Sequence, residues 1–555
     1  MGMSSSEPLR QVRQRRFPPA GLGREMSMPY TAQSWEARVA AHRSWSCVAA
    51  AVIPVLLRLL LLPVAPPPEP YYHDEFAYLL GADTFAQGRL TNPPHPMWVH
   101  LEAFHVNPIP TYASKYPPAQ AILLAVGQAV FGHPWVGVLI GYAFMCGAVC
   151  WALQGWGPPW AALLVSVLSG LHLGFGWTVH SISSHWLNCY WGGAVACAGA
   201  ALVIGALPRL ARRASSTTML AAATGLLVLL NSRPFEGTVM TIVCGAVLAV
   251  FCRGKWQRIG NLGRVAVAIP AIALLLCGGA FMAYYNYRVT GSPLDLPYLV
   301  NQRMYGSVPA FWLAGELPKV AYRHEEIRRL YVDWDLVIHR TVRAAPWISF
   351  ELAARTLIPF LFSVFWLPVL PALLLMRPCR KFKIAVGALA AFVVLAILPM
   401  KMVLTHYFAP AIPLVLIVVM QGFRLLKLAL RQRNHRARLV YGAWVSLCLV
   451  MAFLSAVAWG MWSHQTSSFT QARSTVKALL AAAGPRHLVI VRRGKNASMH
   501  EDWIVNEADI DGSKIVWARD MSPEQNRELL VYFGDRKKWL LEPDQAPLRL
   551  VQYPE

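Results

Sequence analysis

Long apolar runs recur through about the first 460 residues of the sequence. A helix of roughly 20 apolar residues spans the hydrocarbon core of a bilayer. With 56% hydrophobic and only 14% charged residues, the chain has more apolar surface than a water-soluble core can bury. It is therefore predicted to be an all-α polytopic membrane protein with about eleven spans. The expected spans lie near 45–65, 134–154, 159–178, 186–207, 218–231, 235–252, 265–285, 354–376, 384–400, 404–423 and 439–462.

The basic charge of the chain lies in short loops between these runs. The formal net charge is +23, and 17 Lys and Arg residues without any Asp or Glu occupy the loops 208–218, 253–264, 377–383 and 424–438. With eleven spans and a cytoplasmic N-terminus, all four loops lie on the cytoplasmic side, as the positive-inside rule requires. Because no basic stretch carries interleaved aromatic residues for base stacking, nucleic acid is not expected as a partner.

Composition divides the chain into three regions. Residues 1–44 are rich in Arg, Ser and Pro without an apolar period, which predicts a disordered cytoplasmic tail. Residues 45–464 form the membrane domain, whose outer loops are 66–133 and 286–352. The apolar stretch 119–131 is too short to span and is expected to be re-entrant or to lie on the membrane surface.

Residues 465–555 have the composition of a water-soluble domain, which we expect outside the cytoplasm. The runs 488–491, 514–518 and 538–541 predict three strands. Ser522 followed by Pro523 and Gln525 predicts the start of a helix between the last two strands. This order indicates a small C-terminal α/β unit.

An acidic pair, Asp74 and Glu75, follows the first span within YYHDEFAYLLGADTFAQGR, where an interfacial helix is expected after the pair. Adjacent acids in a loop are commonly just solvated. Here aromatic residues surround them, so partial desolvation should raise a carboxyl pKa toward that of a general base. Adjacent side chains point about 100° apart on a helix, so one should carry the chemistry while the other orients or binds. We place the flanking Tyr72 and His73 in substrate binding.

Four basic or imidazole groups fall at the same level of the membrane: Lys115, Arg233, Lys401 and His406. Each also has a structural interpretation, because cations near span ends commonly extend to headgroups and Arg233 lies three residues before Glu236. Several cations facing one carboxylate at a membrane surface suit a lipid phosphate as ligand.

YYHDEFAYLLGADTFAQGR, followed by KYPPAQAILLAVGQAVFG and a spanning helix, resembles the start of the GT-C glycosyltransferases. The likeness is greatest to the branch of protein O-mannosyltransferases and aminoarabinose transferases of lipid A. It implies that Asp74 is the catalytic base, that Glu75 completes the pair, and that Lys115 contacts the donor phosphate. Arg233 in NSRPFEG and His406 in THYFAP are carried over as substrate-binding residues.

The resemblance also implies the reaction. A sugar would pass from a polyprenyl-phosphate donor to a hydroxyl of a glycan, lipid or protein acceptor, with inversion, on the outer face of a bacterial inner membrane. No cofactor is required, no metal ligand is assigned, and a divalent metal ion stays possible. A transporter or flippase of lipid-linked sugars is the alternative, and a scaffold acting through its C-terminal domain is a third interpretation.

Overall fold

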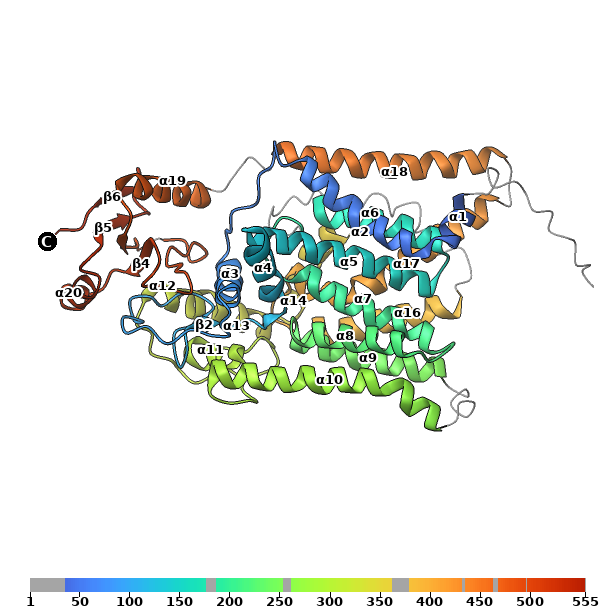
Figure 1. Cartoon of the computed structure of the whole chain (residues 1–555), viewed down its shortest axis with the longest axis horizontal. Coiled ribbons are helices and arrows are strands. Elements are labelled where there is room, and N and C mark those ends of the chain that lie inside the picture. The colour runs from blue at the N-terminus through green and yellow to red at the C-terminus, as the bar shows by residue number, and fades with distance from the viewer. Residues whose placement is uncertain are drawn as a thin grey trace, which may run out of the picture.

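The computed structural model describes residues 35–175, 186–252, 261–361, 379–431, 435–462, 468–495 and 497–554. Its larger part is a bundle of helices that run along the long axis of the molecule (Figure 1). In the described part, seven helices are long and apolar enough to cross a membrane. They are α2 (Arg43–Leu60), α5 (Pro134–Trp156), α7 (Gly193–Leu210), α9 (Pro234–Cys252), α10 (Asn261–Thr290), α17 (Ile412–Arg431) and α18 (His435–Trp462). The chain is a polytopic membrane protein.

The other four expected spans overlap shorter helices, and most of the span expected at 354–376 lies outside the described residues, which end at 361 in that stretch. These are α6 (Pro159–Phe175), α8 (Ser216–Leu230), α14 (Trp347–Leu361) and α16 (Arg380–Phe392), the last continued by a π-helix over Val393–Ile397. Helices α6 and α14 stop where a described stretch of the chain stops. Helix α4 (Pro118–Phe131) has 14 residues, in line with a segment too short to span.

The prediction of a disordered tail is wrong for residues 35–44. Helix α1 (Trp35–Ala41) precedes α2, which begins at Arg43. The ring of Trp35 packs edge-on against Trp160 of α6, with 6.0 Å between centroids, and this tertiary contact leaves no period in the sequence. Residues 1–34 lie outside the described part.

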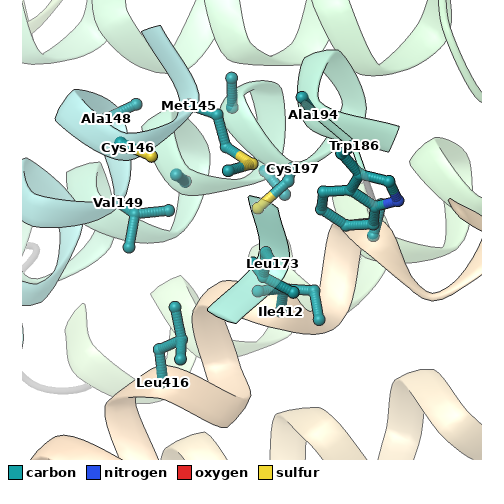
Figure 2. Close-up of a cluster of buried hydrophobic side chains, with 14 of the residues drawn as sticks. Met145, Cys146, Ala148, Val149, Leu173, Trp186, Ala194, Cys197, Ile412 and Leu416 are labelled. Atoms are coloured by element: carbon teal, nitrogen blue, oxygen red, sulfur yellow. The ribbon is translucent and has the colours of Figure 1, made fainter. Parts of the chain in front are cut away.

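The core of the bundle lies between α5, α6, α7 and α17. Figure 2 shows Met145 of α5 reaching toward Cys197 of α7, while Cys146, Val149 and Ile412 belong to the same buried cluster. Cys146 is thus a small core residue. Small residues let these helices approach closely, since a Cβ on Gly205 of α7 would lie 2.6 Å from the Trp151 ring.

The two outer loops fold at one end of the bundle, beside the C-terminal domain and opposite α1 (Figure 1). The first loop holds α3 (His73–Ala86) and an antiparallel hairpin of β1 (Val106–Asn107) and β2 (Ala113–Ser114). The second holds α11 (Pro297–Tyr305), α12 (Glu325–Arg328), a π-helix over Arg329–Leu336 and α13 (Val337–Ala344), while 3-10 turns over Thr405–Tyr407 and Ala409–Ala411 lead into α17. Helix α3 includes the acidic pair instead of following it, because Glu75 accepts the Tyr72 N–H at the helix start.

The C-terminal domain is the predicted α/β unit. Its sheet has the order β4-β3-β5-β6, in which β3 (His487–Val491), β4 (Ile515–Arg519) and β5 (Lys537–Glu542) are parallel and β6 (Arg549–Gln552) is antiparallel. Helix α20 (Pro523–Tyr532) starts with the predicted capping box of Ser522 and Gln525. Helix α19 (Ser468–Ala483) and β6 were not predicted. Ala77 and Leu80 of α3 are buried in the same apolar cluster as the sheet, so the domain and the first loop share a core.

Candidate functional site

The carboxylate of Asp74 lies at the start of α3, beside the Tyr116 hydroxyl and two imidazole rings. The Tyr116 hydroxyl donates to Oδ1, and His73 Nδ1 lies 3.2 Å from Oδ2. His105 Nε2 lies 3.7 Å from Oδ1. Burial by itself would raise the pKa of Asp74, but His105, His73 and Lys115 outweigh it and hold that pKa well below its usual range. The expected upward shift is therefore wrong, and the carboxylate stays ionised and oriented.

Lys115 acts on this carboxylate through His105. Its Nζ lies 2.6 Å from His105 Nδ1, and the two residues are also joined by a backbone hydrogen bond. Burial, together with the Lys115 charge, holds the pKa of His105 well below its ordinary value, although the Asp74 charge acts in the opposite direction. A neutral ring that accepts at Nδ1 carries its proton on Nε2, which faces Asp74. His105 has φ 62°, a left-handed conformation that a non-glycine residue adopts at a cost and that here aims the ring at Asp74.

Both carboxylate oxygens of Glu75 accept backbone N–H groups, as expected for the member of the pair that orients or binds. Its Oε2 accepts the backbone N–H groups of Tyr71 and Tyr72, at 2.9 and 3.2 Å, and its Oε1 accepts that of Tyr190 at 2.9 Å. The side chain is buried. Burial raises its pKa, yet both oxygens are occupied, so geometry makes Glu75 a structural residue that joins α3 to the segment before α7.

The predicted cations gather near Asp74. The charges of Lys401 and Arg233 both act on Lys115. Lys401 Nζ lies 2.7 Å from Asp335 Oδ1, and Arg233 lies 4.0 Å from Glu236 and stacks over the Tyr407 ring. Three like charges at one place are unfavourable without an anion nearby, and a phosphate would supply further negative charge.

Aromatic rings connect the remaining predicted residues. The ring of Tyr72 packs on Trp191, and Trp191 packs edge-on against His406, at 5.4 and 4.6 Å between centroids. His406 is buried, and its Nδ1 has no hydrogen-bond partner among the described residues. All seven residues predicted for the site therefore lie in or beside one constellation.

Three residues of this constellation were not predicted. Tyr116 stands directly after Lys115 in KYPPAQ, and no signal in the sequence marks its hydroxyl for the site. His105 carries no motif, and its role depends on a backbone conformation that the sequence does not announce. His500 comes from the C-terminal domain, whose fold alone brings it to His73.

A metal ion would find ligands at the same place. His73, Asp74 and His105 each offer one ligand atom, and these atoms lie within 4.8 Å of one another. Two imidazole nitrogens and one carboxylate oxygen suit Zn²⁺ or another transition ion better than Mg²⁺, which prefers oxygen ligands.

No protein-family model and no curated protein sequence matches the chain. Among solved structures, the chain is similar to the Archaeoglobus fulgidus oligosaccharyltransferase in complex with zinc and sulfate, at 12% identity and a TM-score of 0.48, covering 89% of this chain and 67% of that one. The apo form of the same enzyme matches at 11% identity and a TM-score of 0.47, covering 83% of this chain and 63% of that one. ArnT from Cupriavidus metallidurans, bound to undecaprenyl phosphate, matches at 11% identity and a TM-score of 0.47. The match covers 89% of this chain and 92% of that one.

The chain spans about two thirds of the length of the archaeal enzyme. The roles of individual residues rest on the site itself.

Proposed function

We propose that the chain is a glycosyltransferase that moves a sugar from a polyprenyl-phosphate donor to an acceptor hydroxyl, with inversion, on the outer face of a bacterial inner membrane. The observation that carries this proposal is the ionised Asp74 carboxylate, held by Tyr116 and His73 beside a cluster of cations. The site lies at the end of an apolar bundle, where a lipid tail can remain in the membrane while its phosphate reaches the cations.

The cations suit the leaving group. As the bond between sugar and phosphate breaks, negative charge grows on the phosphate oxygens, and Lys115, Arg233 and Lys401 would stabilise it. A phosphate stabilised in this way leaves without protonation. One acidic group on the acceptor side is therefore enough, which agrees with a site where Glu75 is occupied by backbone N–H groups.

Asp74 would receive the acceptor. Its low pKa makes it a weak base toward a resting hydroxyl. A hydroxyl oxygen becomes strongly acidic once its bond to the sugar carbon forms, so a weak, well-placed carboxylate can accept the proton late in the reaction. A divalent ion held by His73, Asp74 and His105 would add Lewis-acid stabilisation when bound.

The test is donor turnover by purified protein in lipid nanodiscs. Labelled polyprenyl-phosphate sugars should give transfer to an acceptor or slow hydrolysis, with release of polyprenyl phosphate, and Asp74→Asn is the matched control. If no donor is consumed while labelled lipid crosses between the leaflets of protein-containing vesicles, the proposal is wrong and the transporter alternative is right.

A further inference from the structure

His500 of the C-terminal domain lies directly over the candidate site. Its ring stacks on His73, with 6.1 Å between centroids and 27° between planes, and meets the edge of Trp334 at 5.5 Å. Among the residues that the structure describes, the ring nitrogens of His500 make no hydrogen bond. They are available to a hydroxyl group, as donor or as acceptor.

The turn that carries His500 is fixed by a buried arginine. Arg493 donates to the carbonyl oxygens of Ser498 and Glu501, at 3.2 and 2.5 Å, on either side of His500. Its Nε lies 2.9 Å from Asp544 Oδ2, and its side chain is only 6% exposed. Burying a guanidinium is unfavourable unless its donors are satisfied. The ion pair of Arg493 and Asp544 therefore helps to fix the position of this turn.

The turn is also attached to the first outer loop. The Phe104 N–H donates to Asp502 Oδ2 at 3.1 Å, and Arg519 Nε donates to the Glu102 carbonyl at 2.8 Å. Arg519 is the last residue of β4, and Val491 is the last residue of the neighbouring parallel strand β3. The carboxyl edge of the parallel sheet therefore faces the first outer loop. In Figure 1, α3 lies between the C-terminal elements and the helix bundle.

We propose that His500 binds the acceptor and positions its hydroxyl at Asp74, which rests on the proposed glycosyl transfer. The phosphate-binding cations come from the bundle side, whereas His500 approaches from the water-soluble domain on the other side of His73. The acceptor has to enter from that side, because the lipid-linked donor occupies the membrane side. The C-terminal domain therefore completes the site.

The experiment compares His500→Ala, His500→Gln and Arg493→Met with wild type in nanodiscs, measuring donor Kd and acceptor KM. Arg492→Met is the matched control, because Arg492 is the exposed neighbour that pairs with Asp520 away from the turn. We expect His500→Ala and Arg493→Met to raise acceptor KM about tenfold or more, with donor Kd within about twofold of wild type. His500→Gln, which keeps a hydrogen-bonding group, should recover part of the loss, and Arg492→Met should match wild type.

An unchanged acceptor KM in His500→Ala overturns the proposal, and so does an equal loss of donor and acceptor binding, which would indicate collapse of the site. In both cases the wild-type protein still consumes donor, so the proposed function stands. If wild type consumes no polyprenyl-phosphate sugar, the proposed function and this inference fail together.

Discussion

Lys115 Nζ lies 2.6 Å from Nδ1 of His105, and Nε2 of the same ring faces the Asp74 carboxylate. The lysine carries its positive charge only while it is protonated. Burial lowers the pKa of Lys115 to about 8, so the ammonium charge and its organising effect on His105 are lost as the pH rises through that value. The ordinary pKa of a lysine would keep this charge to about pH 10.

We therefore expect donor turnover to decline above about pH 8 in a profile of kcat/KM against pH. Lys115→Arg keeps its charge throughout this range, so its maximal rate should fall while the alkaline decline moves to higher pH. The pKa of Asp74 is already far below neutrality, so protonation of Asp74 should not reduce the rate between about pH 5 and pH 7. If kcat/KM of Lys115→Arg declines at the same alkaline pH as that of wild type, the decline reports the titration of a group other than Lys115.

Asp74→Asn tests the proposed base. The amide keeps the size of the carboxylate but cannot accept the acceptor proton, and it loses the attraction to the groups around it. Transfer should fall about 100-fold or more, with donor Kd nearly unchanged. Near-normal transfer by purified Asp74→Asn would remove the base from the mechanism, and with it the main support for the transferase proposal.

Glu75→Gln should behave differently from Asp74→Asn. Three backbone N–H groups converge on the Glu75 oxygens, and the amide NH₂ of glutamine would face one of them as a second donor. We expect a loss of about 2–4 kcal/mol in the free energy of unfolding, because a buried charged acceptor is lost and a donor is left unpaired. Thermal unfolding should show the lowered Tm, while the fraction that remains folded keeps substantial turnover. Complete inactivity at wild-type stability would return Glu75 to a catalytic role.

Much of the fold could be predicted because its signals are local. Apolar runs and basic loops mark the spans, and Ser522 with Gln525 marks the start of α20, where capping depends on residues three apart. Helix α1 was missed because it is stabilised by contacts with a distant part of the chain, as Trp35 is by Trp160. Such contacts leave no period in the sequence.

The residues predicted for the site lie together in the structure, and their roles stay predictions. Asp74 and Lys115 could be predicted because they belong to sequence motifs. What distinguishes Glu75 from Asp74 is that backbone N–H groups, such as that of Tyr190, donate to Glu75, and a sequence does not show such contacts. The direction of the Asp74 pKa was wrong for the same reason. Burial can be guessed from aromatic neighbours, but donors such as His105 come from outside the motif.

The charge of the loops makes a topological prediction. Residues 208–218 and 424–438 should be cytoplasmic, while Asp74 and the C-terminal domain should lie outside. Figure 1 places α3 and the C-terminal domain at the same end of the bundle, which requires that they share one side of the membrane. Alkaline phosphatase fused after residue 470 should be active, and the same reporter inserted within 424–438 should be inactive. The reverse pattern would contradict both the span count and the proposed face of catalysis.

Arg58 lies inside the first span and is fully buried, and its three donor nitrogens are all used. Nε donates to Asn188 Oδ1 at 2.6 Å, while Nη1 and Nη2 donate to the carbonyl oxygens of Ala65 and Pro66 at 2.8 and 2.9 Å. The guanidinium thus joins the end of α2 to the segment whose Tyr190 N–H holds Glu75. It acts as a positioning residue for α3, and hence for Asp74.

Arg58→Met should therefore lower both stability and turnover, because it leaves two buried acceptors, Asn188 Oδ1 and the Ala65 carbonyl, without donors at about 1–3 kcal/mol each before relaxation. Arg58→Lys should recover part of the loss, since an ammonium reaches some of these acceptors but lacks the planar geometry of a guanidinium. Arg355→Met is the matched control, because Arg355 is 75% exposed and pairs only along its own helix with Glu351. Thermal unfolding and kcat are measured for all three variants. If Arg58→Met unfolds at the wild-type temperature and turns over donor normally, the position of Asp74 does not depend on this cation, and the Glu75 contacts alone must fix the start of α3.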